Sequence, residues 1–219
     1  ARQPQCCFIN YQLLRKGLEM PIENTNADKA ALRKILLARR AALPAAEAAR
    51  LSGLIQAHIL NTPAWQNAGQ ALIYSPIRNE VDTALLFADA LATGKQALFP
   101  RCLPGQTGIM ELAAVTGPED LRPAAFGILE PDPERCPALR GEALQPDIAV
   151  LPGVGFDCRG FRLGYGAGYY DRALKGAEFR HTYLVGVAYA FQVVDDLRPE
   201  SWDERLDVVI TENGFIFRQ

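Results

Sequence analysis

The sequence predicts an α/β protein, a single domain in which three layers, α/β/α, are built around a largely parallel central sheet. Short apolar runs typical of strands alternate along the chain with segments of helical periodicity, an order that favours a parallel sheet covered by helices. The chain has 219 residues, of which 49% are hydrophobic and 22% charged, and this fits one large globular domain. We find no internal repeat, low-complexity segment or long linker that would divide it.

Two helices are expected before the first strand. Apolar residues recur at helical spacing in the segment 27–43, at Leu32, Ile35, Leu36 and Leu43. Asp28 is suited to cap the amino end of this helix. A second helix is expected over 45–60, and it should end before Pro63, because proline disfavours helix in the residue that precedes it.

The rest of the chain alternates predicted strands and helices. Strands are expected over 70–77, 97–103, 110–115, 147–156, 182–189 and 207–212. Helices are expected over 81–94 and from near Gly168. The segment 116–145 is rich in proline, glycine and charge, and is interpreted as a long loop able to cover a site.

Composition excludes several classes of protein. A formal charge of -2 gives no general attraction to nucleic acid or anionic lipid, so an anion site must be built locally. No stretch approaches the roughly 20 apolar residues of a membrane span, and a cytoplasmic protein is expected. The five cysteines form neither a paired framework nor C-x-x-C spacing, which favours reduced thiols: Cys6, Cys7, Cys102, Cys136 and Cys158. Two histidines, His58 and His181, are too few for a His-rich metal cluster.

Residues 1–27 are interpreted as an N-terminal extension, non-native or weakly ordered, ahead of a folded domain over 28–219. The extension lacks the continuous apolar core of a signal peptide. Met20 is a candidate initiator, in which case residues 1–19 would be vector or upstream sequence. A short docking segment is the alternative.

A glycine-rich loop follows the predicted strand 147–156. In DCRGFRLGYGAGYYDR three glycines alternate with other residues, at Gly164, Gly166 and Gly168. Such a loop can turn its backbone amides inward as a nest for phosphate oxygens, and a helix starting at its end would add a positive dipole. Glycines alone more often mark a tight turn with positive φ. The flanking Arg162, a cation for phosphate, and Asp171, an oxygen ligand for Mg²⁺, favour the phosphate interpretation.

The loop matches neither of two widespread nucleotide-binding motifs. No G-K-[ST] follows it, as in a Walker A sequence, and the later glycine of a dinucleotide fingerprint is missing. Instead RLGYGAGYYDR, preceded by LPGVGFD, resembles the signature of the 5-formyltetrahydrofolate cyclo-ligase family, also called methenyltetrahydrofolate synthetases. The resemblance extends from about Lys29 to Glu212 and includes several motifs in order.

This resemblance implies an ATP site made of two segments. KAALRK resembles the first ATP-binding element of the family, with Lys29 and Arg33 on one helical face: Lys29, Ala30, Ala31, Leu32 and Arg33. The loop would supply the remaining ATP-binding residues: Arg162, Leu163, Gly164, Tyr165, Gly166, Ala167, Gly168, Tyr169 and Tyr170. A solvated helix face is the alternative for the two cations.

Two aspartates are the metal ligands that the resemblance implies. Asp171 would bind Mg²⁺ together with Asp207, which lies in SWDERLDVVITE, similar to the closing motif of the family. Many members carry His-Asp followed by a Val-Pro-like pair before this strand, whereas this chain has Trp202-Asp203-Glu204-Arg205. No histidine is therefore expected to act there, while the metal role of Asp207 is unaffected. A turn residue is the alternative for Asp207.

The folate site is implied by two further motifs. IYSPIRNEVDT resembles the folate-binding segment, so Ser75 and Glu80 would line the substrate, and the Glu80 carboxylate would accept the 2-amino group and ring N–H of the pterin. FGILEP resembles the loop whose aromatic residue packs on the pterin, which gives Phe126 that role. The middle of the glycine loop would also contact the substrate: Tyr165, Gly166, Ala167, Gly168 and Tyr169. A helix N-terminal acid and a core aromatic are the alternatives for Glu80 and Phe126.

The resemblance therefore implies a ligase that forms a cyclic C–N bond. It would convert 5-formyltetrahydrofolate, with or without a polyglutamate tail, into 5,10-methenyltetrahydrofolate, with ATP as co-substrate and Mg²⁺ as cofactor. The formyl oxygen would be phosphorylated and N10 would close the ring, with Arg162 and Tyr169 as the catalytic residues. A monomer without nucleic-acid or membrane partners is expected.

Two other functions stay open. A non-catalytic folate- or nucleotide-binding relative would keep the fold without turnover. The joint presence of six functional side chains argues against it: Lys29, Arg33, Glu80, Arg162, Asp171 and Asp207. An unrelated sugar-phosphate enzyme of similar architecture is the second alternative, because fold alone does not fix function.

Overall fold

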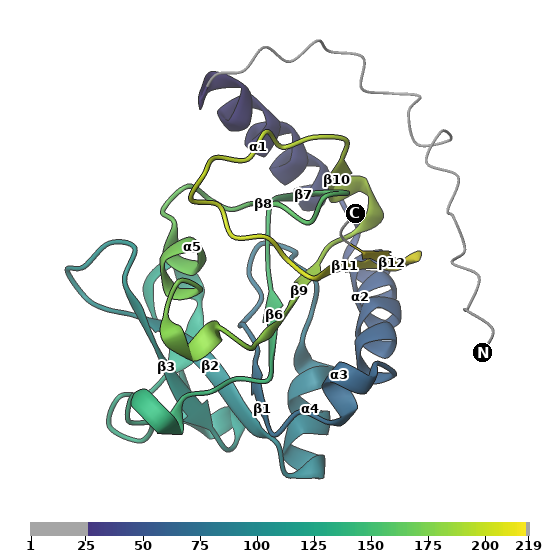
Figure 1. Cartoon of the computed structure of the whole chain (residues 1–219). Coiled ribbons are helices and arrows are strands. Elements are labelled where there is room, and N and C mark those ends of the chain that lie inside the picture. Colours follow the sequence, from purple (N-terminus) through teal and green to yellow (C-terminus); the bar gives the residue numbers. More distant parts are fainter. Residues whose placement is uncertain (1–25, 218–219) are drawn as a thin grey trace, which may run out of the picture.

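A mixed sheet of seven strands forms the centre of the molecule, in the order β12-β11-β9-β6-β1-β2-β3 (Figure 1). The computed structural model describes residues 26–217, without the side chains of 26–28 and of Phe126. The five inner strands are parallel, and an antiparallel strand lies at each edge. The strands are β1 Gln70–Leu72, β2 Gln96–Cys102, β3 Met110–Val115, β6 Ile148–Leu151, β9 Tyr183–Val187, β11 Val208–Thr211 and β12 Gly214–Phe217. The prediction of an α/β domain with a largely parallel sheet is confirmed.

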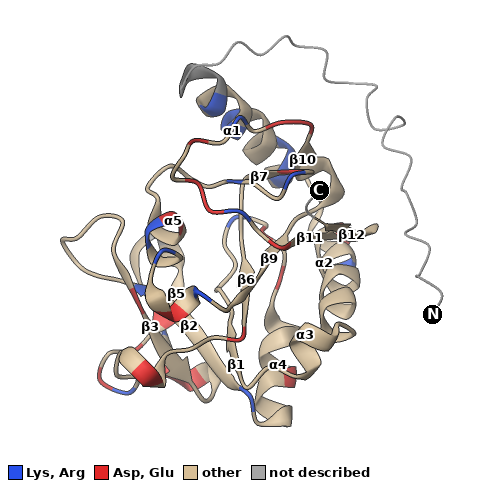
Figure 2. Cartoon of the chain, viewed as in Figure 1, with Lys and Arg blue, Asp and Glu red and all other residues tan. Residues whose placement is uncertain are grey.

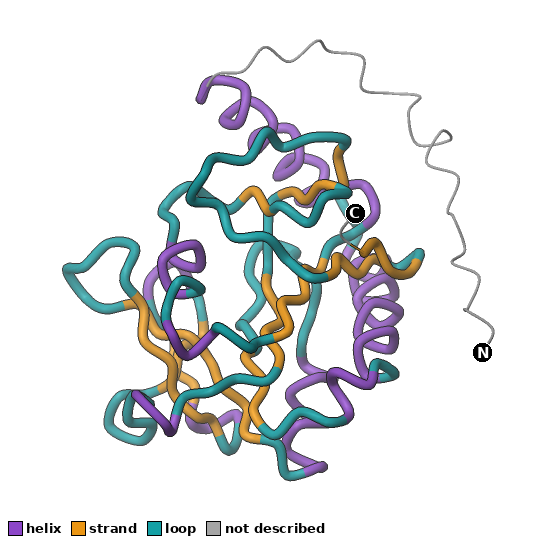
Figure 3. The backbone as a smooth tube through the Cα atoms, viewed as in Figure 1, coloured by secondary structure: helices purple, strands orange, loops and turns teal. Residues whose placement is uncertain are grey.

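Three helices cover one face of this sheet, α2 (Ala45–Leu60), α3 (Pro63–Gln66) and α4 (Ala84–Thr93) (Figures 1 and 3). Ile55 of α2 and Leu86 of α4 are fully buried in the same cluster as Val150 of β6 and Ile73, which directly follows β1. Because alternate residues of a strand point to opposite faces, Leu72 and Leu151 belong to the second apolar cluster, on the other face.

The opposite face is covered by shorter elements. These are α5 (Tyr169–Ala173), the 3₁₀ turns Ala177–Phe179 and Gly141–Ala143, and a small sheet in the order β10-β7-β8. The small sheet consists of β7 Gly155–Asp157, β8 Arg162–Leu163 and β10 Val193–Val194. Phe156 and Leu174 are buried on this side. The third layer is therefore thinner than the sequence predicts, because irregular segments replace long helices.

Helix α1 (Asn26–Ala41) lies over the small sheet. Its Leu36 is fully buried, and a Cβ on Gly155 of β7 would come within 2.7 Å of Leu36 Cδ1, so a larger residue there would displace the Leu36 side chain. The expected cap at Asp28 is wrong, because the helix begins two residues earlier and Asp28 lies in its first turn. Most of residues 1–27 lies outside the described residues, and the boundary at 28 stays a prediction.

Several predicted elements differ in length from those observed. The expected strand 70–77 ends with β1 at Leu72, and the chain then turns above the sheet. The expected strand 147–156 divides into β6 and β7, because Pro152 has no N–H for a continuing ladder. The segment 116–145, expected as a loop, contains an antiparallel hairpin of β4 (Leu121–Pro123) and β5 (Leu129–Pro131) and three 3₁₀ turns.

The two sheets place the loops that follow β1 and β6 next to the β8–α5 loop. In the part of the chain that is described, no helix combines the length and the apolar character needed to cross a membrane. Several Lys and Arg residues lie along α1, which overlies the small sheet, as Figure 2 shows. This arrangement brings cations of α1 towards the glycine-rich loop.

Candidate active site

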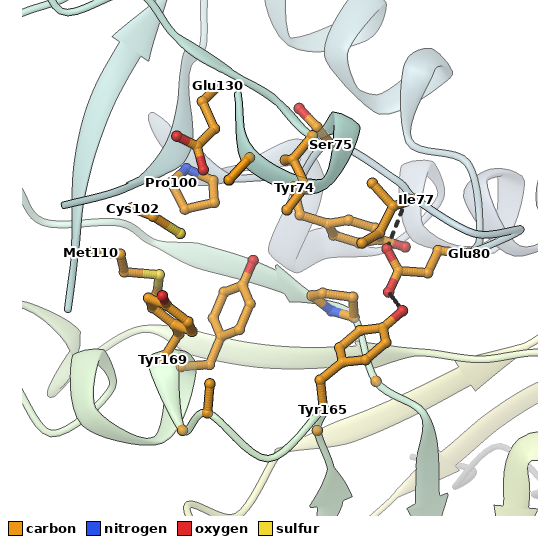
Figure 4. A pocket seen from close by; sticks show the side chains of 18 of the residues that line it. Tyr74, Ser75, Ile77, Glu80, Pro100, Cys102, Met110, Glu130, Tyr165 and Tyr169 are labelled. Atoms are coloured by element: carbon orange, nitrogen blue, oxygen red, sulfur yellow. Dashed lines mark hydrogen bonds between the residues drawn. The ribbon is translucent and has the colours of Figure 1, made fainter. Parts of the chain in front are cut away.

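A cavity of about 360 Å³ opens beyond the carboxyl ends of β1 and β6 (Figure 4). Its walls come from the loops after β1 and β6, the end of β2, the start of β3, the β4–β5 hairpin and the glycine-rich loop with the start of α5. Most of its side chains are apolar or aromatic, as in Tyr74, Pro100, Met110, Ile128 and Tyr169. A concave, largely apolar cavity with a few polar groups is typical of a binding site for a flat organic ring.

The glycine-rich loop presents two different faces. Tyr165 and Tyr169 point from it into the cavity (Figure 4). Gly166 turns towards α1 instead, with its Cβ position 3.9 Å from Arg33 Cζ. Gly166 and Gly168 have φ angles of 106° and 68°, which other residues rarely adopt. The loop therefore separates an apolar cavity on one side from a cationic helix on the other.

The two cations of α1 that were predicted to bind phosphate, Lys29 and Arg33, have different partners in the structure. Arg33 Nε donates a hydrogen bond to the carbonyl oxygen of Gly164 at 2.8 Å, so it contacts the loop directly. Lys29 Nζ lies 3.3 Å from Glu200 Oε1 and 3.6 Å from Asp203 Oδ2. Lys29 is thus held by acids of the segment before β11. The residues between these cations, Ala30, Ala31 and Leu32, lie in α1 and line no part of the cavity.

Arg162 and Asp171 meet across the glycine-rich loop. Arg162 Nη2 donates to Asp171 Oδ1 at 2.7 Å, and its Nη1 donates to the carbonyl oxygen of Pro152 at 3.4 Å. The guanidinium also lies over the Tyr170 ring, with Cζ 5.3 Å from the ring centroid. Burial raises the pKa of the Tyr170 hydroxyl, so this phenol is neutral. Both charged residues line the cavity.

Glu80 lies at another end of the cavity in a buried polar cluster. Its Oε1 accepts from the Tyr165 hydroxyl at 2.9 Å, and its Oε2 accepts from the Ile77 amide at 3.0 Å. Arg40 Nη2 lies 3.7 Å from Glu80 Oε1 and donates to the Tyr165 hydroxyl. Burial raises the pKa of Glu80 despite the bonds from Ile77 and the charge of Arg40. Burial also raises the pKa of Tyr165 to about 12.

Arg40 is a buried cation beside the cavity that the sequence did not single out. It is 1% exposed and donates to the carbonyl oxygens of Arg78 at 3.0 Å and Gly153 at 3.1 Å. One side chain thus joins the loops after β1 and β6. The sequence contained one indication of this role. Arg40 lies four residues after Leu36, on the apolar face of the predicted helix, where charged residues rarely occur without a partner.

The loop after β1 is fixed by two residues in left-handed conformation. Arg78 and Asn79 have φ angles of 48° and 61°. Asn79 Nδ2 donates to the carbonyl oxygens of Arg40 at 3.1 Å and Leu43 at 2.9 Å, so the loop is attached to the end of α1. These bonds offset the backbone strain and hold Ser75 and Glu80, both predicted for the substrate, at the cavity wall.

Of the remaining predicted residues, Phe126 belongs to a segment at the cavity wall, whereas Asp207 lies away from the cavity. The side chain of Phe126 lies outside the described residues, but its neighbours Ala125 and Ile128 line the cavity. Asp207 does not line it, because this residue lies at the amino end of β11 and its Oδ2 accepts from the Leu184 amide at 2.9 Å. The structure therefore does not bring Asp171 and Asp207 to one cavity. Over residues 26–217 no group of three His, Cys, Asp or Glu side chains could hold a metal ion.

Two cavity residues, Cys102 and Glu130, were not assigned a role from the sequence. Burial, with the neighbouring Glu130 carboxylate, raises the pKa of the Cys102 thiol to about 11. Glu130 itself is 7% exposed. Within the described chain Cys102, Cys136 and Cys158 are free thiols, as expected, whereas Cys6 and Cys7 lie outside it.

Comparison with known families identifies the chain at this point. The model of the 5-formyltetrahydrofolate cyclo-ligase family matches residues 25–212. The chain belongs to this family. The family resemblance of the glycine-rich loop and its flanking motifs is thereby confirmed.

Relatives and solved structures agree with this assignment to the cyclo-ligase family. The chain is 30% identical to 5-formyltetrahydrofolate cyclo-ligase of Mus musculus over 204 residues, 89% of this chain and 98% of the relative. It is 31% identical to the enzyme of that name from Mycoplasma pneumoniae over 190 residues, 84% and 99% of the two chains. The structure of Aquifex aeolicus 5,10-methenyltetrahydrofolate synthetase matches with a TM-score of 0.71 and 35% identity, covering 86% of this chain and 92% of that one.

Proposed function

We propose that this protein converts 5-formyltetrahydrofolate into 5,10-methenyltetrahydrofolate and consumes ATP, with release of ADP and phosphate. The observation that carries the proposal is the glycine-rich loop, which has an apolar cavity on one face and Arg33 on the other. A folate ring in the cavity and a triphosphate beside α1 would meet across this loop. The names of the relatives in the cyclo-ligase family support the same reaction.

The cavity suits the folate in shape and chemistry. Aromatic side chains such as Tyr74 and Tyr169 offer faces and edges to a pteridine ring, and Met110 and Ile128 add apolar contacts. Ser75 provides a hydroxyl at the wall. The loop residues from Tyr165 to Tyr169 would then approach the formyl group. Phe126 is kept as a proposed stacking residue, with its side chain still to be placed.

The phosphates of ATP would bind to the other face of the loop. Backbone amides between Leu163 and Tyr170 would cradle phosphate oxygens, and Arg33 already contacts this loop through Gly164. Lys29 lies one helical turn away, where its present acid partners would be replaced by the more highly charged triphosphate. Ala30, Ala31 and Leu32 would contribute as the helix segment that spaces these two cations.

The proposed reaction balances as a phosphoryl transfer followed by ring closure. The formyl oxygen attacks the γ-phosphorus, the bond from phosphorus to the bridging oxygen breaks, and ADP leaves. N10 then adds to the formyl carbon and loses its proton, and the carbon–oxygen bond breaks with phosphate as leaving group. Arg162 would stabilise the charge on the transferred phosphoryl group, and the Tyr169 hydroxyl would orient the formyl group.

Mg²⁺ fits this site through one carboxylate and the phosphates. Asp171 is 28% exposed in its side chain and uses Oδ1 to accept from Arg162. Mg²⁺ commonly binds through one or two carboxylates, water and substrate phosphates, so the absence of a three-residue cluster in the described residues is compatible with it. The ion would neutralise phosphate charge when bound. We propose Asp171 as its ligand, with Asp207 as a second ligand only if the segment before β11 approaches the loop.

The reaction is tested by absorbance in the methenyl-folate band. Purified protein, 5-formyltetrahydrofolate and Mg²⁺ are mixed with and without ATP. We expect an increase in absorbance only with ATP. Folate binding without any increase would instead favour the non-catalytic relative, whereas stabilisation by sugar phosphates and not by folate would favour the second alternative. We propose further that the protein acts in the cytoplasm and that it is a monomer. Light scattering of the purified protein would check the monomer.

A further inference from the structure

Glu130 is a buried carboxylate that lacks a cationic partner. It lies in β5 at the cavity wall and is 7% exposed. Among the described residues no lysine, arginine or histidine forms an ion pair with it, and the Cys102 thiol is its polar neighbour. Arg122, the residue directly opposite in the hairpin, pairs with Asp132 at 3.6 Å instead.

Such a group costs folding free energy. A carboxylate removed from water with few compensating bonds destabilises the folded state. The Cys102 thiol offers one weak donor, and the side chains of Pro100, Met110 and Leu129 in the same wall offer none. Glu80, the other buried acid of the cavity, differs because both of its oxygens accept hydrogen bonds from the protein. Glu130 is therefore the buried acid of the cavity whose side-chain partner among the described residues is only the Cys102 thiol, so most of its acceptor capacity is left for a ligand.

We infer that Glu130 recognises the substrate, because its carboxylate accepts hydrogen bonds from the N3–H and 2-amino groups of the pteridine ring. This inference rests on the proposed function and names the residue that orients the ring. The two donors lie side by side on one edge of the ring, and a carboxylate offers two oxygens at matching spacing. Glu80 then becomes a positioning residue that holds Tyr165 against the substrate.

The position of Glu130 also fits the place where the formyl group must react. Figure 4 shows Glu130 with Pro100 and Cys102 across the cavity from the loop that carries Tyr165 and Tyr169. The pyrimidine edge of a pteridine lies opposite the ring that bears the formyl nitrogen. A ring held by Glu130 at one end would thus present its formyl group to the glycine-rich loop.

The test combines Glu130→Gln with Glu134→Gln, a matched control. Glu134 lies four residues further along and is exposed. In the Glu130 variant we expect the dissociation constant for 5-formyltetrahydrofolate to rise roughly 10- to 100-fold, as when one charge-assisted bond is lost, with ATP binding unchanged. The melting temperature without ligand should stay equal or rise, because a costly buried charge is removed. A role in folding alone would lower it instead.

An analogue that lacks the 2-amino group separates recognition from packing. The wild-type protein should bind this analogue more weakly than 5-formyltetrahydrofolate, and Glu130→Gln should reduce that preference. If the wild-type protein converts 5-formyltetrahydrofolate, but Glu130→Gln changes neither the affinity for it nor the preference over the analogue, the inference on Glu130 is overturned and the proposed function stands. A wild-type protein that neither binds nor converts 5-formyltetrahydrofolate would overturn the proposed function, and this inference with it.

Discussion

Arg162 Nη2 donates a hydrogen bond to Asp171 Oδ1 at 2.7 Å, and this contact links β8 to α5 across the glycine-rich loop. The pair places a cation and a carboxylate at one cavity wall, where phosphate and Mg²⁺ would each need a partner of opposite charge. On binding, the Arg162–Asp171 ion pair would be replaced by two new pairs, Arg162 with phosphate and Asp171 with Mg²⁺. In the structure described, the Arg162–Asp171 contact stabilises the loop.

Asp171→Asn should lower turnover roughly 100-fold or more, because the proposed metal ligand and the charge partner of Arg162 are both lost. The free energy of unfolding should change by less than about 2 kcal/mol, since Asp171 is partly exposed and asparagine keeps one acceptor. Steady-state kinetics and urea unfolding measure the two effects. A higher Mg²⁺ concentration should be needed for half-maximal rate.

A folded Asp171→Asn variant with wild-type turnover would remove Asp171 from the metal site. Asp207→Asn provides the comparison, because its carboxylate lies at the amino end of β11 and accepts from the Leu184 amide. If Asp207 acts only in the fold, its variant should lose stability without a shift in the Mg²⁺ dependence. A shift in both variants would support a site shared by the two aspartates.

Arg33→Gln should raise the KM for ATP roughly tenfold, with little change in the KM for 5-formyltetrahydrofolate. Arg33 contacts the loop on the face turned away from the cavity, so the folate should not sense the change. Lys34→Gln is the matched control, because Lys34 is the next residue of α1 and is exposed. Equal effects of the two substitutions on the KM for ATP would indicate general electrostatics and not a contact of Arg33 with phosphate.

The loop and the helices could be predicted because their signals are local. Gly166 and Gly168, which have positive φ, specify the loop conformation within a few residues, and Ile55 and Ile59 repeat with helical spacing. The hairpin of β4 and β5 was missed because its strands have three residues each, too few for an alternating pattern. Short strands gain their stability from neighbours that the sequence does not display.

The cavity could be predicted only in part, because its polar contacts join distant segments. Arg40 donates to Gly153, 113 positions away, and no local pattern at either residue indicates the contact. Glu130 is similar, since the sequence does not show that no lysine, arginine or histidine of the described chain forms an ion pair with it. Motif resemblance located Glu80 and Ser75 at the wall but could not tell which acid has free acceptors.

Arg40→Met should lower the free energy of unfolding by about 3–5 kcal/mol, because it leaves the buried Glu80 carboxylate without its cation. Glu80→Gln should cost less, since the amide can keep one of the two accepted bonds. The double variant should be more stable than the sum of the single effects by about 1–3 kcal/mol. Urea unfolding of the four proteins gives this coupling, and additive effects would contradict the ion pair.

The same cluster predicts a pH dependence with a definite sign. Burial raises the pKa of Glu80 above its usual 4.5, so the folded state favours the protonated acid. The resulting stability is complete below about pH 4.5 and is lost as the pH rises through the folded-state pKa. Removal of the Arg40 charge should enlarge this loss. Arg40→Met should thus be closer to wild-type stability in acid than at neutral pH, and an equal difference at both would contradict the assignment.

Cys102 lies beside Glu130 at the cavity wall, so the pKa of its thiol depends on that side chain. Burial and the adjacent carboxylate raise the pKa of the thiol to about 11, so alkylation of Cys102 should reach half its maximal rate near that pH. Glu130→Gln should shift this midpoint downward, because the thiolate no longer faces a negative charge. Cys158 is an internal control, since the acids that raise its pKa are Asp157 and Asp195. Mass spectrometry follows each cysteine separately, and a Cys102 midpoint that Glu130→Gln leaves in place would contradict a contribution of residue 130 to the raised pKa of the thiol.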